Sequence, residues 1–353
     1  MSSKDHLSDA ATRHQVFVQR YSTGVARRYN AGLKKTYSEI LARLAEQDLT
    51  ATSAAKLTAI RTEIDQILAK GDTQQQAKLV KELNDFVLNE ADFSGRLLSA
   101  GTAAEFSATI PAAAQLETAL ALKTFQPAGT NTLVNIEQAI SKFGASNAES
   151  VRQVVRDGFL LGDTNATISQ NIKSVQKVAN HQAEALARTM TNHASSVARS
   201  EIYAANDIEQ YQWLSTLDNR TTMTCAGRDG KIYDVQGDNP RPPAHFNCRS
   251  ATIPVVDPEL DLGGKGLGKR SARGLDGKST EVSSQTTFGS WLKKQPAEFQ
   301  DEYFGKFTNG DQKARLFKQG RLSIDKFTDA KGAEYSLDQL RQLNPVAFAK
   351  AGI

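Results

Sequence analysis

The residues whose types and spacing could do chemistry lie together between Asp218 and Cys248. Both cysteines of this 353-residue chain and one of its five histidines fall there, as Cys225, His245 and Cys248. The His-x-x-Cys sequence places two ligands on one tight turn, and Cys225, nineteen intervening residues upstream, offers a third corner. Zinc binds such Cys/His sets tetrahedrally, and nearby prolines stiffen the turn that presents them. The segment therefore predicts a candidate zinc site.

A fourth zinc ligand is not obvious in this segment. Asp218 and Asp229 are the nearest candidates, and water is the fallback. The alternative is that the two cysteines stay reduced and only pack and hydrogen-bond beside the histidine. Two cysteines are too few for a disulfide framework. The sequence leaves both interpretations of the cluster open.

The bulk composition favours long helices over a single large core. Hydrophobic residues make up 39% of the chain and aromatic residues 7%, which suits amphipathic helices and exposed connectors. A formal net charge of +4 is too small to mark the whole protein as a nucleic-acid binder. No apolar run reaches the roughly 18–20 residues that span a bilayer, and the N-terminus lacks the apolar core of a signal peptide. We therefore expect a cytoplasmic protein without membrane contact.

Residues 1–133 are predicted as a helical N-terminal region. Apolar residues recur there at intervals of three and four, which places them on one stripe of a helix. The stripes are Leu33, Tyr37, Ile40, Leu41 and Leu44, then Leu57, Ile60, Ile64, Ile67 and Leu68, then Leu79, Val80, Leu83, Phe86 and Val87. Gly71-Asp72 is predicted as a break between the last two helices. A connector with one short helix is expected over 101–133.

Residues 134–256 are predicted as a second region, with helices first and a loop-rich module after them. Helical patterning runs from about 134 to 160 and again from about 165 to 212. Short β-prone pieces at 231–233 and 251–253 then predict a small sheet among Gly, Asp and Pro. Residues 217–256 form this loop-rich part, here called the knuckle module.

Residues 257–286 are predicted as a Gly-rich basic linker, followed by a helical C-terminal tail over 287–353. Positions 263–277 hold six glycines, and the basic residues of 265–278 are a candidate for non-specific contact with DNA phosphates. The tail is dense in aromatic residues, so we expect it to dock on the knuckle module or on a partner. The fold class is thus mainly α (α+β), with long N-terminal helices, a small loop-rich α/β knuckle module and a short helical C-terminal tail.

Over roughly residues 150–345 the chain resembles the phage Mu protein F-like minor head proteins, the phage head morphogenesis family. The resemblance rests on a set of motifs: Arg199-Ser200-Glu201, Asn206, Trp213, Asp218-x-Arg220-Thr221, Cys225, Gly230, Pro242-Pro243-x-His245-x-x-Cys248-Arg249, and in the tail Trp291-Leu292, Gln295-Pro296, Phe299-Gln300, Gly305 and Lys318-Gln319-Gly320. The family motif often ends Cys-Arg-Cys, and Ser250 replaces the last cysteine here, which removes a potential metal ligand.

The resemblance implies a minor head protein of a tailed double-stranded DNA phage, without enzymatic activity. Such proteins associate with the portal vertex and act in head morphogenesis, and in DNA packaging or ejection. The implied partners are the portal protein and the major capsid or scaffold protein. The implied location is the virion head near the portal, with the host cytoplasm during assembly.

Other functions fit parts of the sequence. Arg199-Ser200-Glu201, with Arg188-Thr189 upstream, resembles the Arg, Ser and Glu that bind NAD in ADP-ribosyltransferases, where they come from separate strands. Adjacent residues on a helix point about 100° apart, so these three cannot converge. A zinc-dependent hydrolase or nuclease would need a general base that the sequence does not identify, and no HExxH is present. A DNA-binding module would rest on 265–278, but no base-reading motif accompanies that segment.

Overall fold

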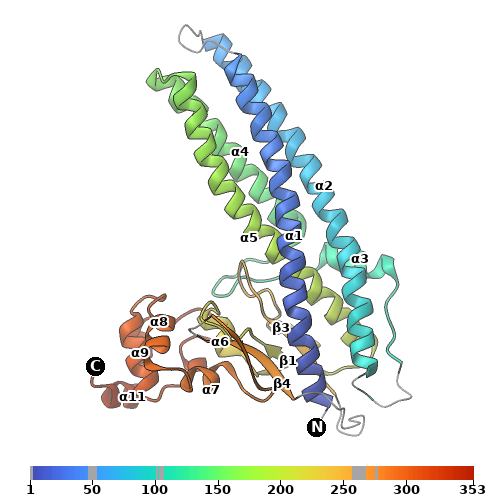
Figure 1. The fold of residues 1–353 in the computed structure, drawn as a ribbon, viewed down its shortest axis with the longest axis vertical. Helices are drawn as coiled ribbons and strands as arrows, with labels where there is room; N and C mark the ends of the chain where they lie inside the picture. The colour runs from blue at the N-terminus through green and yellow to red at the C-terminus, as the bar shows by residue number, and fades with distance from the viewer. Residues whose placement is uncertain (1–2, 47–53, 101, 103–106, 257–267, 275–276) are drawn as a thin grey trace.

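The computed structural model is mostly helical and elongated, with long helices along most of its length and the small sheets and short helices gathered beside one end of them (Figure 1). It describes the chain except for residues 1–2, 47–53, 101, 103–106, 257–267 and 275–276. The long N-terminal helices, the small sheets and the short helices of the tail confirm the predicted fold class. Within the described residues, no helix is both long and apolar enough to cross a membrane.

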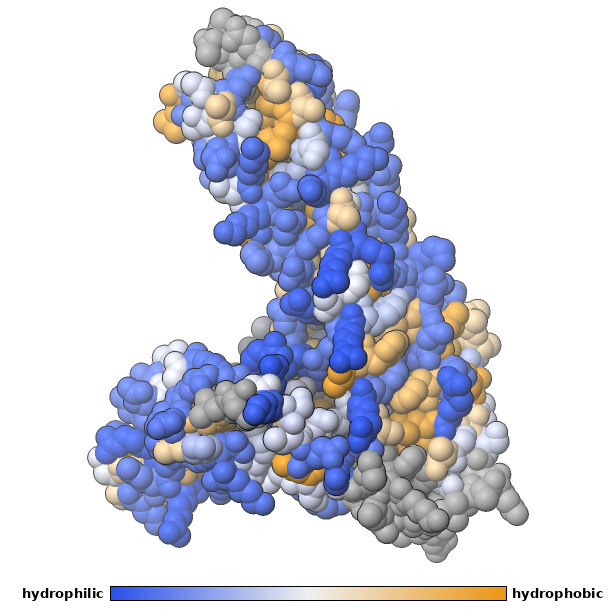
Figure 2. Space-filling view, viewed as in Figure 1, coloured by the Kyte–Doolittle hydropathy of each residue, from blue (hydrophilic) through white to orange (hydrophobic). Residues whose placement is uncertain are grey.

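Four long helices form a stalk: α1 (Ser3–Ala45), α2 (Ala54–Ala100), α4 (Ile136–Leu161) and α5 (Asn165–Ala205). The short helix α3 (Ala113–Leu122) packs beside α2 and α5 at its base. The predicted apolar stripes face the interior of the stalk, where Tyr37, Leu83 and Ile172 are fully buried. One face of the stalk is mainly hydrophilic (Figure 2), as expected of amphipathic helices that bury one side.

Gly71 lies inside α2, so the helix break predicted at this position is wrong. A Cβ on Gly71 would clash with the Thr36 side chain of α1, and one on Gly32 would clash with Gln75 of α2. The two glycines therefore mark a close approach of α1 and α2. Glycine is a weak helix former, but the packing of the two helices outweighs that preference here.

The second region has its predicted helices, but the last of them is shorter than expected. α4 begins at a capping box formed by Asn135 and Gln138, and α5 begins at the N-cap Thr164. The patterning predicted helix to about residue 212. Instead α5 ends at Ala205, and the chain turns into β1 (Gln210–Leu214).

A three-stranded antiparallel sheet follows, in the order β2-β1-β3, with β2 at Ile232–Asp234 and β3 at Ala251–Val255. β2 and β3 are the two β-prone pieces of the prediction. Trp213 of β1 pairs with Thr252 of β3, and its side chain is fully buried beside the two cysteines. This sheet is the base on which the candidate metal ligands lie.

Part of the predicted linker is a hairpin, not a flexible tether. β4 (Lys269–Arg273) pairs in antiparallel fashion with β5 (Ser279–Ser283), and Ala272 also bridges to Leu217 of the knuckle module. Arg270 and Ala272 point inward and are buried, which is the alternation of a half-buried strand. Residues 257–267 of the predicted linker lie outside the described residues.

The hairpin also restricts the predicted DNA contact through 265–278. Arg270 is buried in an ion pair with Asp229, and Lys269 pairs with Glu281 across the hairpin. Arg273 donates a hydrogen bond from Nε to the Gly277 carbonyl. Arg270 is therefore committed to the fold and cannot reach a phosphate, whereas Lys269 and Arg273 stay exposed.

The C-terminal tail docks on the knuckle module, which confirms one of the two expected positions. Its elements are α7 (Phe288–Lys293), α8 (Ala297–Phe304), α9 (Gly310–Lys318), the 3-10 turn Ile324–Lys326, α10 (Leu337–Leu343) and α11 (Pro345–Ala351). Its aromatic side chains form one buried cluster with Leu217 and Met223. The predicted domain limits at 133/134, 256/257 and 286/287 stay predictions, and the buried cluster of the stalk extends across the first of them.

Candidate metal centre

The first ligand candidate, Cys225, lies in the opening turn of α6 (Met223–Arg228). Thr222 caps this helix, because its hydroxyl accepts a hydrogen bond from the Cys225 backbone N–H at 3.4 Å. Trp213 and Cys248 pack against Cys225 in one small buried cluster. The helix start and the sheet together fix the direction of the sulfur.

The other two candidates lie on the tight turn that the His-x-x-Cys sequence predicts. The Cys248 N–H donates to the His245 carbonyl at 3.1 Å. Asn247 closes the turn with φ 61°, in the left-handed region that Asn tolerates better than most residues. The Asn247 N–H donates to the Thr189 hydroxyl of α5 at 2.9 Å, which fastens the turn to the stalk.

The structure brings the three predicted ligand side chains together. One ligand atom from each of Cys225, His245 and Cys248 lies within 4.8 Å of the others. The two sulfurs are 3.7 Å apart, and Cys225 Sγ is 3.2 Å from His245 Nε2. Both cysteines are free thiols and buried.

The His245 ring is oriented as a metal ligand would be. Its Nδ1 lies 2.8 Å from the Phe246 carbonyl oxygen, which only accepts hydrogen bonds, so we assign the proton to Nδ1. In the neutral ring Nε2 then carries the lone pair, and it faces Cys225 Sγ and the Thr222 hydroxyl, 2.9 Å away. Metal-binding histidines commonly donate their second N–H to a carbonyl in this way.

The donor set fits zinc. In a tetrahedral site with Zn–S bonds of about 2.3 Å, two sulfurs lie about 3.8 Å apart, close to the 3.7 Å between Cys225 and Cys248. The Cys248 thiol donates a hydrogen bond that lowers the pKa of Cys225 to about 7, against the opposing effect of burial. Burial raises the pKa of Cys248 well above its usual range. One thiolate is therefore accessible near neutral pH, and a cation would favour the second.

Neither carboxylate predicted as a fourth ligand joins the cluster. Arg249 holds Asp218 with two hydrogen bonds, of 2.5 and 2.7 Å. Burial alone would raise the pKa of Asp218, but the hydrogen bonds and charge of Arg249 outweigh it and the pKa is lowered. Asp229 pairs with Arg270 and accepts the backbone N–H groups of Ser215 and Phe288, both at 2.6 Å. Because Arg249 pairs with Asp218 and Arg270 pairs with Asp229, neither carboxylate is available to bind a metal at the two sulfurs.

Two hydroxyls that the sequence analysis did not assign to the site lie at the cluster instead. Thr222 contacts His245, as described above, and the Ser250 hydroxyl hydrogen-bonds to Cys225 and helps to lower its pKa. Ser250 is buried and lies 3.3 Å from the Ser215 hydroxyl. Its position could have been predicted, because it occupies the place of the last cysteine in the Cys-Arg-Cys motif. Thr222 carries no such signal in the sequence.

The residues that resemble an ADP-ribosyltransferase triad lie on α5 and diverge. Arg199 is buried and points toward Glu90 of α2, with a closest approach of 3.9 Å. Glu201 instead pairs with Lys123, which follows α3. The side chains of Arg199 and Glu201 therefore serve different helix contacts and line no common site.

Comparison with known proteins finds one family match, over a segment that includes the candidate metal centre. Residues 149–253 match the family described as Phage Mu protein F like protein, so the chain carries a Phage Mu protein F-like domain. The matched segment contains all three ligand candidates, as well as α5 and the three-stranded sheet. No solved structure matches the chain significantly.

Two curated relatives match parts of the chain. An uncharacterized protein of Haemophilus influenzae is 26% identical over 123 residues, which are 34% of this chain and 28% of that protein. A protein of Enterococcus faecalis named NAD(+)--arginine ADP-ribosyltransferase EFV is 25% identical over 236 residues, 61% of this chain and 45% of that protein. The chain thus spans less than half the length of either relative.

Proposed function

We propose that this protein is a minor head protein of a tailed double-stranded DNA phage, which binds the portal protein and acts in head morphogenesis without catalysing a reaction. The observation that carries the proposal is the Phage Mu protein F-like domain over 149–253, a family associated with head morphogenesis. The major capsid or scaffold protein is a further partner, and DNA packaging or ejection the step it would influence. Its place would be in the virion head near the portal.

The lack of a general base near the metal centre, among the residues that the structure describes, supports a structural role. A hydrolytic zinc site needs an open coordination position and a general base close to the metal-bound water. The two nearest carboxylates, Asp218 and Asp229, are held by arginines. Within the described residues, no carboxylate belongs to the cluster of Cys225, His245 and Cys248. Bound zinc would supply a cross-link between α6 and the His-x-x-Cys turn.

The position of the knuckle module suits a protein whose role is to bind other proteins. The knuckle module is fixed to the stalk through Asn247 and Thr189, and to the tail through Leu217 and Met223. A rigid junction of this kind keeps the stalk and the tail in a fixed relation. Such pre-organisation lowers the entropic cost of binding to a large symmetrical partner.

The ADP-ribosyltransferase activity in the name of the E. faecalis relative belongs to that protein, and less than half of its length is matched here. Arg199 and Glu201 of this chain line no common NAD site. The name of this relative still indicates which result would contradict the proposal: NAD⁺ consumption by this chain would indicate an enzyme.

The test is co-expression of the full chain with a tailed-phage portal protein from the same source, followed by affinity purification and cryo-electron microscopy. We expect a stable complex with density for the stalk or the tail on the portal. Parallel assays would measure NAD⁺ consumption and DNA hydrolysis, with a His245→Ala variant as the control. If no complex formed and turnover was lost in His245→Ala, the protein would be a zinc enzyme and the proposal would fall.

A further inference from the structure

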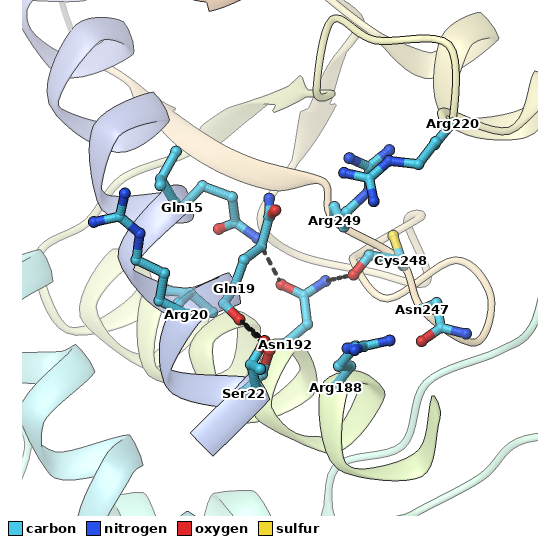
Figure 3. A pocket seen from close by; sticks show the side chains of 13 residues that line it. Gln15, Gln19, Arg20, Ser22, Arg188, Asn192, Arg220, Asn247, Cys248 and Arg249 are labelled. Carbon is cyan, nitrogen blue, oxygen red and sulfur yellow. Dashed lines mark hydrogen bonds between the residues drawn. The ribbon is translucent and has the colours of Figure 1, made fainter. Parts of the chain in front are cut away.

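A cavity of about 560 Å³ lies between α1 and the knuckle module. Figure 3 shows Gln15, Gln19, Arg20 and Ser22 of α1 on one side and Arg220 and Arg249 on the other. Arg188 and Asn192 of α5 lie below them. The volume falls within the range of ligand sites, roughly 300–1,000 Å³. Three elements that are far apart in sequence build this cavity.

The lining is cationic. It contains four arginines, Arg20, Arg188, Arg220 and Arg249, and no aspartate or glutamate. Asp218 pairs with both Arg249 and Arg220, and Glu184 pairs with Arg188. Four positive charges against these two carboxylates leave a local excess of two. Within the described part of the chain, Arg20 makes no ion pair.

The floor of the cavity is preformed. Asn192 donates from its amide to the Cys248 and Ser250 carbonyls at 3.1 and 3.3 Å, and it accepts from Gln15 at 3.1 Å. These buried groups are therefore satisfied and fixed. The amides of Gln19 and Asn247, by contrast, make no side-chain hydrogen bond within the described residues, so they offer a donor and an acceptor each.

We propose that this cavity binds a short acidic peptide segment of a protein partner, with Arg188, Arg220 and Arg249 receiving its carboxylates. Guanidinium groups bind carboxylates through paired N–H donors. Arg249 already does so with Asp218, which uses two of its five N–H groups. The cavity thus contains an example of the contact that the proposal requires.

The lining favours a peptide over a nucleic acid. No aromatic side chain lines the cavity, so a single strand would find no surface on which its bases could stack. The side chain of Arg249 is only 17% exposed, which recesses it from the rigid phosphate rows of a duplex. A flexible peptide can enter the cavity, and its backbone offers both donors and acceptors to Gln19 and Asn247.

The proposal is tested with the full chain and a fluorescein-labelled hexaglutamate peptide, by fluorescence anisotropy at low ionic strength. We expect saturable binding of hexaglutamate and none of an equally long hexaglutamine peptide. An Arg188→Gln/Arg220→Gln variant should bind about tenfold more weakly or worse. Arg220→Gln alone, at a side chain that is 65% exposed, should weaken binding in the same direction without risk to the fold.

The matched control is Arg96→Gln/Arg156→Gln, which removes two exposed arginines outside the cavity with the same change in net charge. It should leave the affinity within about twofold, because exposed charges beyond a Debye length are screened. Equal weakening by this control would overturn the proposal, as would failure of hexaglutamate to bind. A short DNA duplex or inorganic phosphate that bound more tightly, with the same dependence on Arg188 and Arg220, would assign the cavity to phosphates instead.

Discussion

Asp229 and Arg270 form an ion pair that is closed off from solvent, although 41 positions separate them in the chain. Arg270 Nη1 lies 3.0 Å from Asp229 Oδ2, and the two side chains are 3% and 0% exposed. Arg270 also donates to the Ser215 carbonyl, and Asp229 accepts the backbone N–H of Phe288, which begins α7. This pair therefore joins the sheet, the hairpin and the tail at one point.

The first prediction concerns the loss of one partner of this pair. Arg270→Met leaves the Asp229 carboxylate buried with only backbone donors, and we expect the free energy of unfolding to fall by about 3–5 kcal/mol. Urea unfolding followed by circular dichroism measures the change. The control is Arg273→Met on the same strand, where the side chain is exposed and the expected loss is below about 1 kcal/mol. Similar losses in both variants would mean that the ion pair contributes nothing specific.

The long helices could be predicted because the signal is local. Leu33, Tyr37, Ile40 and Leu44 recur at helical spacing, and all four are buried in the stalk. Only adjacent turns of one helix are needed to recognise such a stripe. The same local reasoning misjudged Gly71, because the reason for a glycine there lies on another helix.

The hairpin could not be predicted in this way. From the sequence alone, Arg270 is expected to be solvated, because it lies in a glycine-rich segment. Its burial depends on the ion pair with Asp229, which is remote in sequence. Only part of the candidate site could likewise be predicted from the sequence. The cluster of Cys225, His245 and Cys248 follows from residue types and one short motif, whereas the roles of Asp218 and Asp229 depend on which arginine reaches them. That zinc binds the cluster stays a prediction.

The second prediction tests the close approach at Gly71. Alanine favours a helix over glycine by about 1 kcal/mol, so propensity alone would make Gly71→Ala stabilising. Its Cβ would clash with Thr36, and we expect a net loss of about 1–3 kcal/mol in the free energy of unfolding. Gly24→Ala on α1 is the control, because only the flexible end of Arg28 lies near its Cβ, and it should be neutral or stabilising. A stabilised Gly71→Ala protein would contradict the packing described here.

The third prediction concerns pH and His193 of α5. Burial lowers the pKa of His193 from 6.5 to about 4, and its Nε2 lies 3.0 Å from the Lys123 carbonyl. The unfolded chain takes up this proton below about pH 6.5, whereas the folded protein does so only below about pH 4. The stabilisation is therefore complete above pH 6.5 and is lost as the pH falls toward 4, by about 3 kcal/mol at 1.36 kcal/mol per pH unit.

Chemical unfolding at several pH values measures this dependence. In His193→Gln the slope of unfolding free energy against pH between 4 and 6.5 should decrease, whatever the stability at neutral pH. His181→Gln, at an exposed position on the same helix, is the control and should keep the slope of the unmodified protein. An unchanged slope in His193→Gln would show that other groups govern the acid sensitivity.

The fourth prediction concerns the metal centre and Ser250. The Ser250 hydroxyl hydrogen-bonds to Cys225 and takes the position of the family's last cysteine, so Ser250→Cys should place a fourth ligand at the cluster. We expect the unmodified protein to retain zinc with three protein ligands, and Ser250→Cys to hold it about tenfold more tightly or better. Competition with a colorimetric zinc chelator measures the affinity, and Cys248→Ser should weaken it strongly.

Ser146→Cys, which adds a thiol at an exposed position of α4, separates the effect of a fourth ligand from that of one more cysteine. It should match the unmodified protein in zinc affinity. Acidification should release zinc from all of these proteins, because thiolates and neutral imidazole bind the metal while their protonated forms do not. If neither the unmodified protein nor Ser250→Cys retained zinc, the three side chains would only pack and hydrogen-bond, and the cross-link between α6 and the His-x-x-Cys turn would have no metal in it.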